Sequence, residues 1–363
     1  MSNVTQSQVE EALKGYVDPH LDRDLVSAKA VKEISVDGAK VTVKVVLGYP
    51  AKGFRDRLAA ALKEKVEALD GVDQAEVDVS WKIDSHVVQK NIQIIEGVKN
   101  IIAIASGKGG VGKSTTAVNL ALALSAEGAN VGILDADIYG PSQPRMLGVS
   151  GKPESADGKS LEPMVSYHLQ AMSIGFLIDE DTPMIWRGPM VTQALEQLLK
   201  DTNWKNLDYL IVDMPPGTGD TQLTLAQKVP VSGAIIVTTP QDIALLDAKK
   251  GFKMFEKVEV PVLGIVENMS IHICSNCGHE EHIFGEGGGQ RMSEEYDVDF
   301  LGALPLDLRI REETDSGKPT VVAEPDSRIS EIYREIARRA AAKLSLQAKN
   351  YAAKFPQIVI QNN

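Results

Sequence analysis

Hydrophobic and polar residues follow two different patterns along the chain. Up to residue 82, hydrophobic residues either alternate with polar ones, as in half-buried strands, or recur at helical spacing. The predicted elements are helices at 6–16 and 54–69 and strands at 32–36, 40–49 and 75–81, with a hairpin turn at Asp37-Gly38. This order of elements predicts a small α+β domain over residues 1–82.

From Ile101 onward, short uninterrupted hydrophobic segments alternate with helical ones. Strands without alternation are typical of a parallel sheet that is buried on both faces. The predicted strands are 101–106, 130–137, 209–214, 234–240, 262–269 and 300–305, and the predicted helices are 114–127, 190–201, 221–228, 242–257 and 288–296. We therefore expect an α/β fold with a doubly wound, mostly parallel sheet over residues 99–363. A linker at 83–98 precedes it, and ligands are expected at the carboxyl ends of the strands.

A final helix is predicted at 327–354, with Ile329, Ile332, Ile336 and Ala340 on one face. The segment carries seven Lys or Arg against two Glu. Such a helix either docks on the sheet with a solvated basic face or lies on a membrane surface. Its hydrophobic face lacks the Trp, Phe and Leu of interfacial helices, which favours docking.

Composition supports a folded protein with more than one domain. Of its 363 residues, 43% are hydrophobic and 24% charged, and a chain of this length can bury a core without disulfides. The net charge of −12 argues against binding to the phosphate backbone of nucleic acids. The chain has two cysteines, no leader-like N-terminus and no hydrophobic run near the ~18–20 residues that span a bilayer. We therefore expect a cytoplasmic protein without stable membrane association.

A glycine-rich loop between the strand at 101–106 and the helix at 114–127 carries the strongest chemical signal. Its sequence GKGGVGKS matches the phosphate-binding motif G-x-x-x-x-G-K-[ST] at every defined position. Loop amides and the helix start would hold the phosphates of ATP, with Lys113 at the β/γ-phosphates and the Ser114 hydroxyl on Mg²⁺. The predicted nucleotide site comprises Gly107, Lys108, Gly109, Gly110, Val111, Gly112, Lys113, Ser114 and Thr115.

Three aspartates follow predicted strands in the order expected of a nucleotide hydrolase. Asp135 and Asp137 end the second strand of the α/β region, and Asp213 ends the third. Carboxylates at the tips of adjacent parallel strands face the phosphate site, where one can hold Mg²⁺ through water and another can orient the attacking water. Taken singly, each aspartate could instead cap a helix or turn. We expect Asp135 to have a supporting role.

The cysteines, Cys274 and Cys277, form a C-x-x-C segment with His272, His279 and His282 close by in the sequence. Three interpretations compete. A zinc site of two Cys and two His within one chain conflicts with the short spacing to His279. A thioredoxin-like redox pair would need a helix N-terminus that is not predicted here. A half-site completed by the same cysteines of a twofold-related subunit would supply four thiolates, which suit zinc or a [4Fe–4S] cluster. The thiolate count favours this third interpretation.

Several motifs together resemble the Mrp/ApbC family of iron–sulfur cluster carrier ATPases. These are GKGGVGKST, DADIYGPSQP (135–144), WRGPM (186–190), DMPPGTGD (213–220), VENMS (266–270) and the C-x-x-C. The loop resembles the deviant Walker A form shared with MinD, the ParA partition proteins and the nitrogenase iron protein. The first 80 residues resemble the small iron–sulfur assembly domain often fused ahead of bacterial Mrp proteins.

The resemblance implies roles for single residues. Lys108 would cross a dimer interface to the partner's nucleotide and join Lys113, Asp137 and Asp213 in the catalytic set. Within that set, Asp137 would be the switch I aspartate and Asp213 would belong to Walker B. Asn268 would contact the adenine, although it could instead be a turn residue.

The resemblance also implies a slow, ATP-hydrolysing homodimer. It would hold a labile [4Fe–4S] cluster on Cys274 and Cys277 of both subunits, with zinc possible in apo preparations. Its partners would be assembly scaffold proteins and the apo-proteins that receive the cluster. One departure is that the front domain has no cysteine to offer as a ligand.

Two other functions stay open at this point. A MinD/ParA-like positioning ATPase would act on membrane or DNA, and a nucleotide-regulated zinc protein would use the cysteines differently. The acidity of the chain and the C-x-x-C argue against the positioning ATPase.

Overall fold

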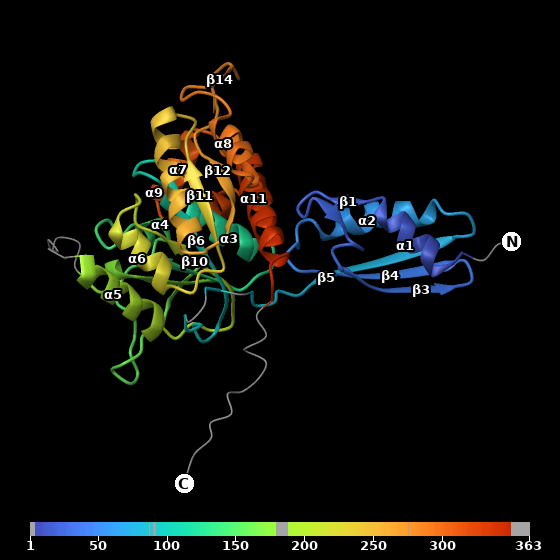
Figure 1. The fold of residues 1–363 in the computed structure, drawn as a ribbon, viewed down its shortest axis with the longest axis horizontal. Coiled ribbons are helices and arrows are strands. Elements are labelled where there is room, and N and C mark those ends of the chain that lie inside the picture. The colour runs from blue at the N-terminus through green and yellow to red at the C-terminus, as the bar shows by residue number, and fades with distance from the viewer. Residues whose placement is uncertain (1–3, 87, 90–91, 179–187, 275, 350–363) are drawn as a thin grey trace, which may run out of the picture.

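The computed structural model describes residues 4–86, 88–89, 92–178, 188–274 and 276–349. They form a small front lobe and a larger α/β lobe, which lie side by side (Figure 1). The front lobe follows the predicted α+β order. Its elements are α1 (Gln6–Lys14), β1 (Val17–Asp18), β2 (Arg23–Asp24), β3 (Val31–Asp37), β4 (Lys40–Leu47), α2 (Arg55–Glu67) and β5 (Gln74–Trp81).

Strand β4 organises the front lobe because it lies in the middle of the β3-β4-β5 sheet. It pairs antiparallel with β3 through the predicted turn, where Gly38 has a φ of 59°, and parallel with β5 after the α2 crossover. Alternate residues of β4 are buried, namely Val41, Val43, Val45 and Leu47. The alternation in the sequence therefore marks the face that packs against the helices.

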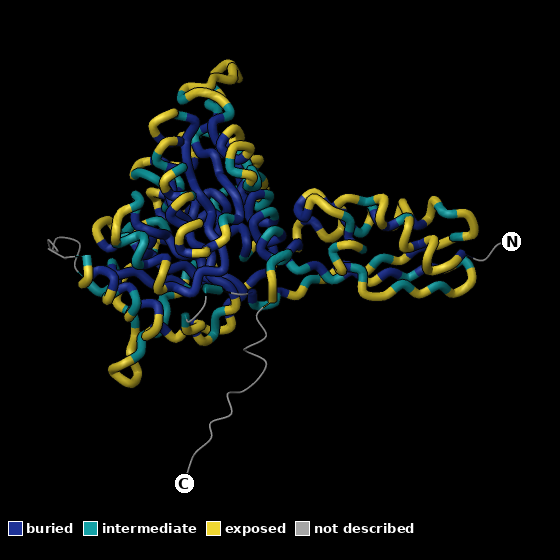
Figure 2. Tube along the Cα trace, viewed as in Figure 1, coloured by how far each residue is buried: buried dark blue, intermediate teal, exposed yellow. Residues whose placement is uncertain are grey.

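The large lobe is built on an eight-stranded sheet in the order β15-β12-β11-β6-β10-β7-β9-β8. Every neighbouring pair is parallel except β8 with β9, which confirms the predicted doubly wound, mostly parallel sheet. Figure 2 shows these strands as the buried centre of the lobe. The strands are β6 (Val98–Ala105), β7 (Val131–Asp135), β8 (Met164–Ser166), β9 (Leu169–Ser173), β10 (Leu207–Asp213), β11 (Gly233–Thr238), β12 (Val262–Glu267) and β15 (Phe300–Ala303).

Helices cover both faces of this sheet. On one face α3 (Lys113–Ala126) packs against β6, β7 and β10, and α11 (Arg328–Ser345) packs against α3 and β15. On the other, α7 (Asp242–Lys257) covers β11 and α8 (Gly288–Tyr296) covers β12 (Figure 1). The remaining elements are α4 (Gln143–Met146), the 3-10 helix at Ile174–Phe176, α5 (Gly188–Asp201), α6 (Asp220–Lys228), the short strands β13 (His272–Ile273) and β14 (Glu280–Glu281), α9 (Leu308–Asp315) and α10 (Thr320–Ala323).

The structure differs from the predicted elements in two respects. The elements that were not predicted are short and have weak hydrophobic spacing, namely β1, β2, β8, β9, β13, β14, α4, α9 and α10. Helix α11 ends at Ser345, whereas the prediction carried it to 354. Lys349 leaves the helical path and makes an antiparallel bridge with His86 in the predicted linker. Positions 350–354 of that prediction lie outside the described residues.

Helix α11 docks on the sheet as predicted, but its basic face is not simply solvated, because Arg338 is buried and Arg334 and Lys343 are largely covered by their ion-pair partners. Ile329, Ile336 and Ala340 are buried against the sheet and α3, which confirms the docked interpretation over a membrane-surface helix. In the described part of the chain, no helix is both long enough and apolar enough to cross a bilayer. The division at residues 82 and 99 remains our prediction for the domain boundaries.

A buried ionic cluster joins the two lobes. Glu127, directly after α3, is fully buried. Its carboxylate accepts hydrogen bonds from Nε of Arg334 (2.7 Å) and Nη1 of Arg338 (2.9 Å), both on α11. It also accepts one from the backbone N–H of Gly53 (2.8 Å) in the front lobe. Arg338 reaches on to Nε2 of buried His20, 3.2 Å away. These five residues, called the junction cluster below, tie the front lobe to the far end of α3.

Candidate functional site

The glycine-rich loop lies between β6 and α3, as predicted, at the carboxyl edge of the sheet. Gly110 and Gly112 have φ values of 81° and 79°, the left-handed region in which other residues are strained. Gly107 passes so close to α7 that a Cβ there would lie 2.1 Å from the backbone carbon of Asp247. These glycines let the loop curl at the start of α3, where backbone amides and the helix dipole favour an anion.

Lys113 lies at the centre of the site. Its side chain is 6% exposed and forms an ion pair with the fully buried carboxylate of Asp213 at the end of β10. Its Nζ also lies 3.2 Å from the hydroxyl of Ser114. The structure therefore brings together the predicted phosphate-binding lysine, the predicted Mg²⁺ hydroxyl and the predicted Walker B aspartate.

Asp135 and Asp213 end neighbouring strands and are register partners in the β7–β10 pair. Burial, and next the charge of Asp213, raise the pKa of Asp135 to about 7. One oxygen of Asp135 accepts hydrogen bonds from the backbone N–H of Ser142 (2.9 Å) and Gln143 (3.0 Å) and from the hydroxyl of Ser173 (3.1 Å). Asp135 thus holds the loop after β7, in keeping with a supporting role.

Gln143 is a site residue that the sequence did not single out. It is 1% exposed, and its side-chain amide donates to Oδ2 of Asp213 (2.9 Å) and to the backbone carbonyl of Ser114 (3.2 Å). It lies within the DADIYGPSQP motif, but nothing in that motif indicates which strand its side chain will reach.

Asp137 and Lys108 flank this centre. Burial raises the pKa of Asp137, and the charge of Lys113 opposes that rise, which places the two side chains in one electrostatic environment. Lys108 is half-buried in the loop. Among the described residues, no carboxylate forms an ion pair with Lys108.

Asn268 contacts the loop from the end of β12. Its amide donates to the carbonyl of Val111 (2.9 Å), and its side-chain oxygen accepts from the N–H of Met269 (2.9 Å). A Cβ on Gly112 would lie 2.1 Å from the Asn268 amide nitrogen, so glycine is required there. Asn268 is a loop-bracing residue in this structure, and its contact with adenine remains a prediction.

The segment that leaves β12 carries the cysteines outward. It forms the small β13–β14 hairpin, which projects from the large lobe (Figure 1). Cys274 is half-buried and Cys277 exposed. The backbone N–H groups of Asn276 and Cys277, followed by the Cys277 side chain, lower the pKa of Cys274. A thiol that ionises more readily is a better ligand for a soft metal.

The three histidines near the cysteines differ in their contacts. His272 Nδ1 lies 3.1 Å from the carbonyl of Leu306, and His282 Nδ1 lies 2.9 Å from that of Ser270, whereas His279 is exposed. Across the residues that the structure describes, no three His, Cys, Asp or Glu side chains converge into a metal site. A mononuclear two-Cys, two-His site within one chain is therefore not assembled in this conformation.

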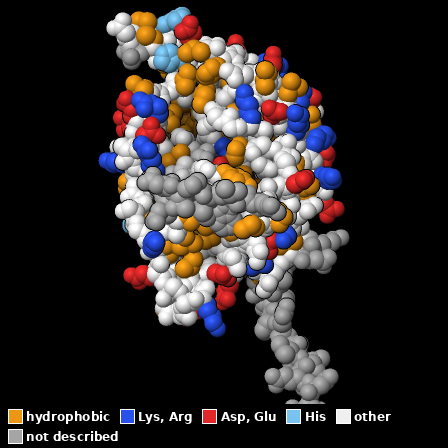
Figure 3. All heavy atoms as spheres, turned by 90° about the vertical axis from the view of Figure 1, so that its left-hand side faces the viewer, with side chains coloured by type: hydrophobic (Ala, Val, Ile, Leu, Met, Phe, Trp, Pro, Cys, Tyr) orange, Lys and Arg blue, Asp and Glu red, His pale blue; other side chains and the backbone are white. Residues whose placement is uncertain are grey.

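Hydrophobic side chains gather on the face that carries the hairpin (Figure 3). The exposed large hydrophobic side chains of the hairpin segment and of α7 are Ile273, Ile283, Ile243 and Leu246. Exposed hydrophobic surface of this kind is typical of an interaction face. Trp186 and Arg187 of the WRGPM motif lie outside the described residues.

Two family profiles match this chain. Residues 97–341 match the family described as NUBPL iron-transfer P-loop NTPase. Residues 6–79 match the family described as iron-sulfur cluster assembly protein. The two matches correspond to the large and the front lobe.

Curated relatives cover between two thirds and nearly all of the chain. The iron-sulfur cluster carrier protein of Escherichia coli strain K12 is 50% identical over 362 residues, which span 96% of this chain and 97% of the relative. The iron-sulfur cluster transfer protein NUBPL of Mus musculus is 53% identical over 252 residues, 69% of this chain and 79% of the relative.

Solved structures resemble the large lobe. A nucleotide-binding protein from Archaeoglobus fulgidus, in complex with ADP and with cobalt found by PIXE, aligns with a TM-score of 0.56 and 37% identity. The alignment covers 64% of this chain and 90% of that protein. The cell division ATPase MinD of Pyrococcus furiosus aligns with a TM-score of 0.50 and 23% identity over 66% of this chain and 97% of MinD. At that identity the likeness to MinD concerns the fold alone.

Proposed function

This chain belongs to the Mrp/ApbC/NUBPL family of iron–sulfur cluster carriers, P-loop NTPases that here carry an N-terminal iron–sulfur assembly domain. We propose that it works as an ATP-hydrolysing homodimer that holds a labile [4Fe–4S] cluster between its subunits and passes it to apo-proteins. The observation that carries the proposal is the path of the chain after β12. Asn268 braces the nucleotide loop, and the same segment continues into the exposed hairpin with Cys274 and Cys277.

The site fits a nucleotide with Mg²⁺. The left-handed glycines form a cradle that a side chain would fill, and the donor set of buried Lys113, Ser114 and loop amides suits phosphate. When bound, Mg²⁺ neutralises charge on the phosphates as the bond to the γ-phosphate breaks. Ser114 would ligate Mg²⁺ directly, and Asp213 would ligate it through water.

The ion pair between Lys113 and Asp213 implies a change of partner. Lys113 must release Asp213 to face the β/γ-phosphates, which frees a buried carboxylate for the metal. Gln143 donates to Oδ2 of Asp213 at 2.9 Å in this structure, and the same contact would keep that oxygen hydrogen-bonded during the exchange. Asp137 would orient the attacking water. Slow basal hydrolysis follows if the partner subunit or a client completes the site.

A dimer would place Lys108 at the partner's nucleotide. The half-buried ammonium with no ion pair in the described part of the chain, together with the hydrophobic side chains around the hairpin face, supports such an interface (Figure 3). The same interface would bring the two cysteine pairs together and supply the four thiolates that a [4Fe–4S] cluster requires.

Lys108→Ala is expected to leave ATP binding largely intact and to slow hydrolysis, because the intrachain cradle around Lys113 is unchanged. In dimers that mix wild-type and Lys108→Ala subunits, hydrolysis at the two nucleotide sites can be measured separately if one subunit also carries a reporter nucleotide. The variant subunit should impair its neighbour's site more than its own. Impairment confined to its own site would contradict the crossing geometry.

The cluster is expected to depend on both cysteines. Cys274→Ala or Cys277→Ala should abolish stable binding of the cluster. ATP binding should persist, because the cysteines lie on the hairpin and not in the glycine-rich loop. Iron, sulfide and the visible spectrum after anaerobic reconstitution measure this, with about one cluster expected per wild-type dimer.

His279→Ala is the matched control, since His279 is exposed on the same hairpin and should be dispensable. A full cluster in each monomer, or a cluster retained by the double cysteine variant, would refute the shared site. Zinc at the cysteines in protein purified in air is compatible with it, because four thiolates also suit tetrahedral zinc.

A further inference from the structure

A cleft at the lobe junction lies apart from the nucleotide and cysteine sites. It is lined by residues of the front lobe, by the segment after β5 and by the end of α11, and its volume is about 410 Å³. This volume lies in the range of ligand sites, which occur preferentially between domains. The cleft has hydrophobic side chains, among them Leu47 and Leu346, and a set of lysines.

The charge of the cleft opposes that of the protein. Lys29, Lys32, Lys82 and Lys349 line it together with a single carboxylate, Asp84, in a chain of net charge −12. Nζ of Lys349 forms an ion pair with Oδ2 of Asp84 at 2.7 Å. Among the described residues, no ion pair neutralises the other three lysines. Burial lowers the pKa of His86, which also lines the cleft, so the positive charge there comes from the lysines.

Lys29 occupies a backbone position that disfavours lysine. Its φ is 56°, and it is the only lysine among the described non-glycine residues with positive φ. The preceding turn fixes this geometry, because the Asp24 carboxylate accepts from the N–H of Ser27 (2.8 Å) and the Lys29 N–H bonds to the carbonyl of Val26 (2.9 Å). The Lys29 carbonyl in turn accepts from Nζ of Lys32 (2.6 Å), which holds the ammonium of Lys32 at this turn.

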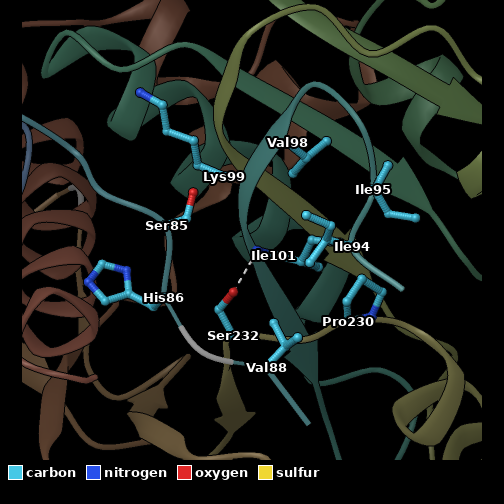
Figure 4. Close-up of a pocket in the computed structure, with 10 residues that line it drawn as sticks. All are labelled: Ser85, His86, Val88, Ile94, Ile95, Val98, Lys99, Ile101, Pro230 and Ser232. Atoms are coloured by element: carbon cyan, nitrogen blue, oxygen red, sulfur yellow. Dashed lines mark hydrogen bonds between the residues drawn. The ribbon is translucent and has the colours of Figure 1, made fainter. Parts of the chain in front are cut away.

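The segment that carries Lys82 and Asp84 forms one wall of the cleft, and buried neighbouring residues hold this segment in place. Ile83 and His86 are buried, and the backbone N–H of His86 donates to the side-chain oxygen of Asn100 (3.0 Å). Beyond His86, side chains of the same segment turn into a second, smaller pocket of about 50 Å³ against Ile101 and Pro230 (Figure 4).

We propose that the lysine cleft at the lobe junction binds an acidic peptide segment of a partner protein. Carboxylates of the segment would meet Lys29, Lys32 and Lys82. Apolar side chains between them would cover the half-buried Val46 and Leu346. The partner is a scaffold or recipient in the sense of the proposed function, on which this identification rests. The bound peptide segment would contact both lobes at once, so its affinity would depend on how the lobes are docked.

The test uses full-length protein without nucleotide or cluster, so it does not depend on the cargo. A short fluorescein-labelled peptide in which Glu and Leu alternate is titrated and followed by anisotropy, beside a peptide with Gln at each Glu. The Glu peptide should bind and weaken as salt rises, and the Gln peptide should not bind. If the cysteine variants refute the shared cluster site while the Glu peptide still binds, the proposal about the cluster is overturned and the proposal about the cleft is not affected.

Two variants localise the binding. Lys82→Glu should abolish it, while Lys159→Glu, on an exposed loop of the large lobe, should retain it. Lys29→Gly should weaken binding about tenfold without lowering the melting temperature, because glycine relaxes the left-handed backbone. Equal binding of both peptides, or equal losses in Lys82→Glu and Lys159→Glu, would overturn the proposal, as would failure of the wild type to bind.

Discussion

Lys113→Ala is expected to abolish ATP binding or to lower hydrolysis by about 10²–10³-fold, the usual cost of removing a preorganised charge at a reacting centre. The structure adds a second reason. Lys113 is the ionic partner of Asp213, which is fully buried, so the substitution also leaves a carboxylate without its counter-charge. Binding of a fluorescent ATP analogue and single-turnover hydrolysis measure the two effects separately.

A milder substitution separates catalysis from folding. Lys113→Gln removes the charge but keeps a donor that can reach Asp213, so its melting temperature should stay nearer to wild type while its hydrolysis falls as in Lys113→Ala. Wild-type hydrolysis in either variant would refute the assignment of the loop as the nucleotide site.

Glu127→Ala is expected to destabilise the junction between the lobes by about 3–5 kcal/mol, since it removes the shared acceptor of two buried or half-buried arginines. The Gly53 N–H loses its acceptor as well. Thermal unfolding should show the front lobe melting separately, and hydrogen exchange should rise along the facing surfaces of α3 and α11.

Glu76→Ala is the matched control, because Glu76 pairs with Lys40 on the surface, with exposed fractions of 64% and 50%. An exposed pair of this kind contributes about 0–1 kcal/mol, so little change is expected. If the two glutamate variants unfold alike, the junction cluster does not hold the lobes together. Because Glu127 ends the helix that begins at Lys113, the same pair of variants also tests whether lobe docking affects nucleotide affinity.

Local features of the sequence were sufficient for much of the fold. The alternation in β4 and the unbroken hydrophobic strands of the large lobe predicted which faces are buried, because each pattern records the burial of its own element. The glycine loop was identifiable because its chemistry lies in contiguous residues, from Gly107 to Ser114. The predicted adjacency of Asp135 and Asp213 was confirmed because tips of parallel strands meet at one edge.

Weak local signals explain the errors in the fold. The three residues of β8 and the four of α10 are too short for a period to emerge. Helical spacing continued past Ser345, yet the chain turns there to pair Lys349 with His86. That contact depends on a segment far away in the sequence, so no local pattern could have indicated it.

The sequence by itself determined the two lobes, the main strands and helices of each, the nucleotide loop and the candidate ligands at Cys274 and Cys277. Only the tertiary structure decided which distant side chains act on them. Gln143 reaches Asp213 across 70 positions, Asn268 reaches Val111 across 157, and Glu127 meets Arg338 across 211. A polar residue has no periodic signature for its partner, because a hydrogen bond or ion pair depends on where two backbones come together. The lysine cleft has the same origin, since Lys29 and Lys32 meet Lys82 only in the folded front lobe, and Lys349 joins them only where the end of α11 lies against that lobe.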